Sequence, residues 1–167
     1  TTGATFTIND DAGTEDDLKV GHVVSVTGTI DANGTTGDAT QVIFDDSVKG
    51  PVQSIVVAAN RLVVLGQTVL ISPATSFDDG FSPASLDGVS VGQIVEVSGQ
   101  FDANGNIVAT RIEPKPAGTV FEVHGTVTAL DTANFLFNLN GLVVDYSAAT
   151  LDNFTGGQIA NGDFVEA

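Results

Sequence analysis

The sequence repeats itself, and this constrains the fold more than any other feature, because each copy of a repeat adopts the same local structure. Two groups of short segments share an apolar strand-like stretch, an Asp-Ala-Asn-Gly turn and a second apolar stretch. They are residues 21–28, 31–34 and 39–42, and residues 92–99, 102–105 and 109–112. A second match places residues 50–75 on residues 125–150 at a constant offset of 75, without a gap. The chain therefore contains one complete unit, preceded by the back half of another and followed by the front part of a third.

β-Strand patterns dominate the complete unit. Strands are predicted at Val48–Ile55, Arg61–Ile71, Gln93–Gln100 and Asn106–Glu113. A hairpin turn or bulge is expected around Gly66, and residues 85–89 are compatible with one helical turn. Short strands of this kind bury their apolar face most economically as a small closed barrel, which also removes exposed sheet edges. The sequence predicts an all-β protein made of tandem OB- or SH3-like five-stranded barrels.

The repeat boundaries divide the chain into three parts. Residues 1–47 are predicted to be the C-terminal half of a barrel unit, residues 48–115 a complete unit, and residues 119–167 the N-terminal part of a third unit. Each incomplete part would expose unpaired backbone groups, and each carries strands that the other lacks. Two arrangements remain open. Either the chain is a segment of a longer covalent tandem array, or the partial unit at residues 119–167 of one molecule is completed by the partial unit at residues 1–47 of the next.

Charge and composition limit the partners of such a protein. Twenty-one acidic residues oppose five basic ones, which gives a net charge of −16. Nucleic acid and anionic membrane surfaces are disfavoured, because both require a basic footprint. The chain has no cysteine and no methionine, not even at position 1, which predicts a processed or excised product. The composition favours an extracellular or cell-surface protein of a bacterium or archaeon, without membrane insertion.

The repeat also resembles a known family. The resemblance lies in Val63–Val69, Ala74–Phe77, Val91–Gly99, Asp102–Gly105 and Ala109–Glu113, which are similar to the bacterial DUF5666 family, and the flanking partial units resemble it too. The resemblance implies small OB-like barrels, often in tandem on exported proteins. The family has no assigned activity, so it supplies no catalytic residue.

Acidic loops are the first candidate binding sites. Residues Asn9–Asp17 hold five carboxylates in one connector, and Asp78-Asp79 lie in the matching connector of the second unit. Flexible Asp- and Gly-rich loops can supply the roughly six to eight oxygens that Ca²⁺ needs, so a calcium site is one interpretation. The spacing matches no EF-hand loop, and solvated loops with Asx turns and helix caps are the simpler interpretation. No metal ligand is assigned, and Ca²⁺ is kept as the one cofactor to test.

Imidazole and aromatic side chains are the remaining candidates. His22 and His124 have Gln93 and Lys49 at the matching repeat positions, so neither position requires an imidazole and both are predicted as surface strand residues. Five phenylalanines are predicted to form barrel core, because a base-stacking platform would need neighbouring Arg or Lys. They are Phe6, Phe77, Phe81, Phe135 and Phe137. No nucleophilic triad, zinc site or phosphate loop is assigned, so the sequence predicts neither catalytic nor cofactor-binding residues.

Two functions follow from these observations. The first is a non-enzymatic structural protein, a subunit or segment of an extracellular fibre, filament or stalk assembled from barrel repeats by strand completion. Its partner is then another copy joined head to tail, or the covalent continuation of the tandem. The alternative is a Ca²⁺- or ligand-binding OB-like module of a secreted protein. The absence of tryptophan and the single tyrosine, Tyr146, argue against sugar stacking, and an enzyme ranks behind both.

Overall fold

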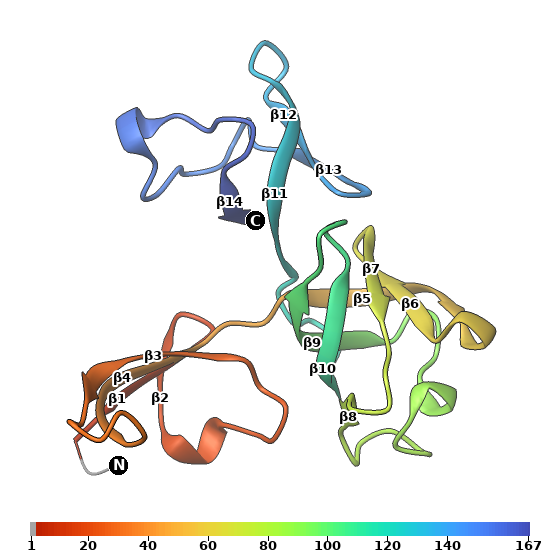
Figure 1. Ribbon diagram of the computed structural model, residues 1–167. Helices are drawn as coiled ribbons and strands as arrows, with labels where there is room; N and C mark the ends of the chain where they lie inside the picture. The colour runs from red at the N-terminus through yellow and green to blue at the C-terminus, as the bar shows by residue number, and fades with distance from the viewer. Residues whose placement is uncertain (1–2) are drawn as a thin grey trace.

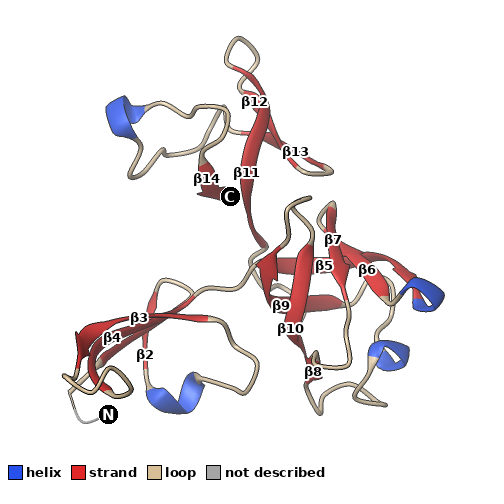
Figure 2. Ribbon diagram, in the orientation of Figure 1, coloured by secondary structure: helices blue, strands red, loops and turns tan. Residues whose placement is uncertain are grey.

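The computed structural model describes residues 3–167. Thr1 and Thr2, the first residues of the predicted N-terminal half-unit, lie outside the described residues. The chain forms three lobes that follow one another along the sequence and are joined by short segments (Figure 1). Among the described residues, the regular structure is β-strand apart from four 3₁₀ turns (Figure 2), which confirms the predicted all-β class. No described helix is long and apolar enough to span a membrane.

The central lobe is a closed five-stranded barrel. Its elements are β5 (Val48–Val56), η2 (Val57–Ala59), β6 (Arg61–Val64), β7 (Gln67–Leu70), β8 (Ser76–Phe77), η3 (Leu86–Gly88), β9 (Ile94–Phe101) and β10 (Ile107–Pro114). The barrel closes in the order β5-β6-β7-β10-β9 and back to β5. Its neighbouring strands are antiparallel except β7 and β10, which run parallel, and the short β8 adds to β10. The predicted five-stranded barrel is therefore present.

The core of this barrel comes from alternate residues of its strands, because successive side chains of a strand point to opposite faces. Val95 and Val97 of β9 and Leu62 of β6 are fully buried. Burying a side chain of this size stabilises the fold by roughly 1.5–3 kcal/mol. The connector adds Phe81 and Leu86 to the same core, and η3 lies at the predicted helical turn.

The hairpin between β6 and β7 turns at Leu65 and Gly66, as the sequence predicts. Both residues have positive φ, 46° and 73°, which is the backbone that a two-residue type I′ turn requires. Glycine adopts this conformation at little cost, whereas leucine is strained in it. The tight turn presents Gly66 on the surface of the central lobe, where the third lobe contacts it.

The first lobe is a four-stranded sheet with the order β2-β1-β4-β3. Its elements are β1 (Thr5–Ile8), β2 (Asp11–Gly13), η1 (Glu15–Asp17), β3 (Val24–Ile30) and β4 (Gly37–Phe44). β1, β3 and β4 are the counterparts of β8, β9 and β10, since Val26 faces Val42 as Val97 faces Ile112. The described residues of this lobe include no counterparts of β5, β6 and β7, so its barrel is open.

The third lobe holds the complementary part of a barrel. Its elements are β11 (Glu122–Asp131), β12 (Leu136–Leu139), β13 (Leu142–Asp145), η4 (Thr155–Gly157) and β14 (Phe164–Glu166). β11, β12 and β13 repeat the meander of β5, β6 and β7. β14 pairs with β11 as the start of β9 pairs with β5, so that Gly125 faces Val165 as Gly50 faces Val95. The described strands of this lobe include no counterpart of β10, which leaves a gap between β13 and β14.

The predicted aromatic core is largely present. Phe81 and Phe137 are buried, Phe77 packs against the same core, and Phe6 is half-buried in the first lobe. Phe135 is 49% exposed, so its prediction as a core residue is wrong. It lies in the turn between β11 and β12 with a positive φ of 56°, and its ring contacts Tyr146 edge-on at 5.7 Å between ring centroids.

Candidate functional site

Most of the few basic side chains of the chain lie where the lobes meet. Three of its five basic side chains, Lys49, Arg111 and Lys115, form ion pairs at these contacts. Lys49 and Arg111 are 7% and 8% exposed, and charged residues are seldom buried to this extent unless they are paired. The candidate functional site is therefore the set of joints between the lobes.

The first joint holds the first lobe against β10 of the central barrel. The Arg111 guanidinium pairs with Glu113 on the same strand and with Asp78, where Nη2 lies 2.6 Å from Oδ2. Its Nη1 donates a hydrogen bond of 3.3 Å to the carbonyl oxygen of Val20 in the first lobe. The fixed fork of guanidinium donors thus links the two lobes while satisfying two carboxylates.

The backbones of the two lobes approach closely beside this arginine. At Gly21, φ is +99° and a Cβ atom would lie 2.7 Å from the carbonyl oxygen of Thr110. Gly92 occupies the matching position of the central unit with φ of +87°, but a Cβ atom there would meet nothing within 4 Å. The left-handed backbone at both glycines is therefore a feature of the repeat, whereas the close contact at Gly21 arises because the first lobe packs against the central barrel there.

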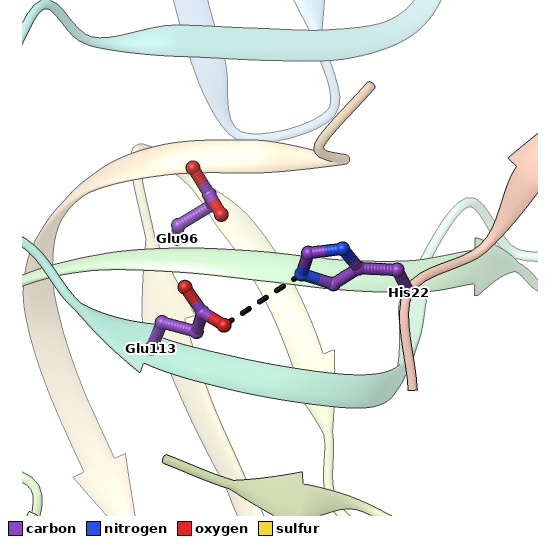
Figure 3. A group of neighbouring side chains, drawn as sticks. All are labelled: His22, Glu96 and Glu113. Carbon is purple, nitrogen blue, oxygen red and sulfur yellow. Dashed lines mark ion pairs between the residues drawn. The ribbon is translucent and has the colours of Figure 1, made fainter. Parts of the chain in front are cut away.

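His22 lies in the same joint, and its prediction as a surface strand residue is wrong. It precedes β3, and its side chain is only 5% exposed. The imidazole stacks on Phe44 at 3.9 Å between ring centroids, and Nδ1 accepts a hydrogen bond of 3.3 Å from the Lys19 N–H. Nε2 faces Glu113 Oε1 at 3.6 Å (Figure 3). His124 does lie in a strand, β11, as predicted, although its side chain is largely covered.

His22, Glu96 and Glu113 offer three ligand atoms within 4.8 Å of one another, but their bonding does not fit a metal ion. Because Nδ1 of His22 accepts a hydrogen bond, the neutral ring carries its proton on Nε2, the atom that faces Glu113 (Figure 3). The Lys115 ammonium lies 3.0 Å from Glu96 and 3.3 Å from Glu113, so both carboxylates already have a cation. The cluster is an ion-pair joint.

Glu113 is held ionised in this joint. The pKa of Glu113 lies well below its usual range. The N–H of His22 that faces it is the largest cause, and together with Arg111 and Lys115 it outweighs burial, which acts in the opposite direction. The stability that the ionised form contributes is fully present above the ordinary pKa of glutamate, about 4.3, and is lost as the pH falls below it. Glu113 is therefore ionised at neutral pH, as its ion pairs in the first joint require.

All three lobes meet at a second charged cluster around Lys49, which we call the junction. Its Nζ pairs with Glu122 at the start of β11 and lies 3.2 Å from Asp46, in the segment between β4 and β5. Asn9 brings in the first lobe, since its Nδ2 donates to Glu96 Oε2 at 3.1 Å and its Oδ1 accepts from the Asp46 N–H at 3.0 Å. Burial opposes the charge of Lys49, but Glu122 and Asp46 hold its pKa above the usual value.

Asp46 is the most deeply buried acid of this junction. It is 1% exposed, and neither carboxylate oxygen has a hydrogen-bond partner of normal geometry among the described groups. The pKa of Asp46 is raised to about 7, chiefly by burial and also by the charges of Glu96 and Glu122, against the opposing charge of Lys49. The junction therefore changes its charge state near neutral pH.

The second joint connects hairpin turns of the central and third lobes. Gln67 is fully buried, and its Nε2 donates to the Leu139 carbonyl oxygen at 2.9 Å while its Oε1 accepts from Asn140 Nδ2 at 2.7 Å. The Gly141 N–H donates to the Gly66 carbonyl oxygen at 3.3 Å. A Cβ atom on Gly66 would lie 2.6 Å from the carbonyl carbon of Gly141. Glycine at these two matching positions therefore lets consecutive repeats touch through their turns.

The third lobe opens into a cavity where its barrel is incomplete. The cavity has a volume of about 1030 Å³, and its lining includes Phe137, Tyr146, Phe154 and Ile159. The counterpart of Phe137 in the central barrel is Leu62, which is fully buried in a closed core. The cavity is thus the unfinished core of a barrel.

A protein-family model matches nearly the whole chain. The model, described as a domain of unknown function, covers residues 1–42, 49–113 and 124–167. The chain belongs to the DUF5666 family. This confirms the resemblance in the sequence, and each DUF5666 segment falls in one lobe. No curated protein and no solved structure matches the chain.

The joints lie partly outside the DUF5666 segments. Asp46 falls in the gap between the first two segments, and Lys115 and Glu122 fall in the gap between the second and third. Their partners Lys49 and Glu96 lie inside the second segment. The charged contacts between the lobes therefore need residues that lie between the DUF5666 segments, whereas the second joint, from Gly66 to Gly141, lies inside two matched segments.

The acidic loops singled out from the sequence do not converge on one point. Asp17 accepts hydrogen bonds from the N–H and hydroxyl of Thr14 at 2.8 and 2.9 Å, which caps η1. Asp78 is engaged by Arg111. In the part of the chain that the structure describes, carboxylate and imidazole ligands converge in threes only at the first joint. The geometry of Asp17 matches the helix-cap interpretation of these loops.

One short sequence motif has the spacing of a catalytic site. Gly88-Val89-Ser90-Val91-Gly92 has the Gly-x-Ser-x-Gly spacing of a nucleophile elbow. Such an elbow leads from a strand into a helix, whereas this segment leads from η3 into β9. The Ser90 N–H donates to Gln93 Oε1 at 3.2 Å in an exposed loop. The order of elements is reversed, so the motif does not build an elbow.

Proposed function

We propose that the chain is a non-enzymatic structural segment of an extracellular fibre, filament or stalk, built from DUF5666 barrels that complete one another with strands. The exposed apolar face of β3 is the observation that carries this proposal. Val26 is 60% exposed, whereas Val97 at the matching position of the closed barrel is fully buried. A strand with a free edge and an apolar face is a template for another strand.

The joints support the same proposal. Buried ion pairs around Lys49 and Arg111 and the glycine contact of Gly66 with Gly141 hold three lobes in a fixed arrangement. An elongated assembly needs such joints, because flexible linkers would let the barrels tumble independently. The net charge of −16 keeps an array of this kind soluble.

A binding module is the alternative function, and the cavity of the third lobe is the observation in its favour. Its volume of about 1030 Å³ lies at the upper end of the range of small-molecule sites, roughly 300–1,000 Å³. The Ca²⁺ version rests on the acidic loops alone. If it is correct, removal of Ca²⁺ with a chelator lowers the thermal unfolding temperature or changes the hydrodynamic radius.

Electron microscopy of native material, with the intact mass of its denatured chains, tests the structural proposal. We expect elongated particles on the cell surface or in the medium. A denatured mass of 17.0 kDa means separate copies that complete one another, and a mass several times larger means a covalent tandem. Compact monomers of the smaller mass would contradict the proposal and favour the binding module.

A further inference from the structure

We propose that the open third lobe is completed by the first lobe of a second copy of this chain, with β3 and β4 in the positions that β9 and β10 occupy in the central barrel. The inference rests on the proposed function and names its partner and contact surface. The central barrel is the template, since it shows how one repeat unit presents β8, β9 and β10 to β5, β6 and β7.

β4 fits the gap between β13 and β14. In the central barrel β10 runs parallel to β7, with Val108 opposite Leu70. The counterpart of Val108 on β4 is Asp38, and the counterpart of Leu70 on β13 is Asp145. In the completed barrel, Asp38 of one copy therefore lies opposite Asp145 of the next.

β3 supplies the apolar face that the cavity lacks. Val24 and Val26 are 39% and 60% exposed, whereas Val95 and Val97, at the matching positions of the central barrel, are fully buried. In the third lobe the corresponding edge of β11 is held by β14, which has three residues. β3 has seven residues in the matching register. Docking of the second copy therefore replaces β14 with the longer β3 at this edge of β11.

Both contacting lobes are acidic, which gives the assembly a salt dependence. Residues 1–47 hold nine acidic side chains and one basic one, and residues 119–167 hold six acidic and no basic ones. Like charges opposite each other in a sheet are destabilising, and Asp38 and Asp145 form such a pair. Salt screens this repulsion, because the Debye length falls from about 30 Å at 0.01 M to about 3 Å at 1 M. The assembly is therefore stronger at high ionic strength.

Cross-linking of the full chain tests the contact, since the chain has no cysteine of its own. Chains with Asp38→Cys are mixed with chains with Asp145→Cys and treated with a short bismaleimide reagent at low and high NaCl. We expect a product of twice the chain mass from the mixture, several-fold more than from either variant alone. We expect more of it at high salt, because the other acidic side chains of both lobes still repel one another. Asp87→Cys, an exposed position on η3, replaces Asp38→Cys in the control and gives only background.

Val26→Asp in the Asp38→Cys chain is the second variant. We expect it to remove the cross-linked product without changing the thermal unfolding temperature, whereas Val26→Ile retains the product. Absence of the product at about 1 M NaCl, with monomers in light scattering, would overturn the inference. The proposed function fails by a different result, namely compact monomers in native material, so the two failures are distinguishable.

Discussion

The central and first lobes contain the same strand pair in two different surroundings. β9 and β3 align residue by residue, with Val97 matching Val26 and Gly99 matching Gly28. In the central lobe β5 covers the free edge of β9, and the valine is fully buried. In the first lobe no described strand covers β3 on that side, and the valine is 60% exposed. The local sequence specifies the strand, and the presence of a partner strand decides whether its apolar face is buried.

The same comparison separates what belongs to the repeat from what belongs to the joints. Hairpin turns, strand register and the helical turn of η3 recur because each unit carries the residues for them. The buried charges around Lys49 do not recur, since the matching position in the third lobe is His124. The charged joints are therefore a part of the molecule in which one repeat differs from the next.

The largest expected effect comes from placing a charge at the two matching valines. Val97→Asp buries a carboxylate in the closed core, which we expect to cost more than about 4 kcal/mol and to abolish cooperative unfolding of the central lobe. Val26→Asp places the same charge in solvent in the isolated chain and should cost below about 1 kcal/mol. Urea denaturation of both variants measures the difference. Equal destabilisation would mean that the first lobe is also closed in solution.

A second pair of variants compares the joint with the open lobe. Lys49→Ala leaves the buried Asp46 and the half-buried Glu122 without their cation, and breaking a buried ion pair in this way costs about 3–5 kcal/mol. His124→Ala, at the matching position of the third lobe, removes a contact of 3.4 Å to the more exposed Glu166 and should cost roughly 0–1 kcal/mol. Both values are read from chemical denaturation at pH 8. A small effect of Lys49→Ala would contradict the assignment of Lys49 as the centre of the junction.

Asp46→Asn tests the charge state of the junction. The pKa of Asp46 is raised to about 7. At pH values between the ordinary pKa of aspartate and about 7, Asp46 is therefore protonated in the folded chain and ionised in the unfolded chain. Stability is then lost as the pH rises through this range, and the asparagine variant should be more stable at pH 8 by on the order of 2 kcal/mol. Glu113 stays ionised throughout that range. A wild-type stability that is flat between pH 5 and 8 would contradict this account.

The sequence predicts the repeat units better than it predicts their contacts. Alternating apolar residues and the turn at Gly66 correctly place the barrel strands, because both are local signals. His22 is misassigned because its burial depends on Phe44 and Glu113, which come together only when two units pack. Asp46 carries no local signal either, since a single aspartate between two strands is typical of a solvated loop.

The smallest expected effect concerns the two glycines at matching positions, Gly21 and Gly92. Alanine at either one is strained by the left-handed backbone, at a cost of roughly 1–2 kcal/mol. At Gly21 the added Cβ atom also meets the Thr110 carbonyl oxygen at 2.7 Å, so only this variant has to push the first lobe away from the central barrel. Chemical denaturation should show about 1 kcal/mol more destabilisation for Gly21→Ala, and small-angle scattering should show a larger radius of gyration for it alone. Indistinguishable stabilities and scattering curves would mean that the first lobe already moves freely, and the joint would then not fix the direction of the array.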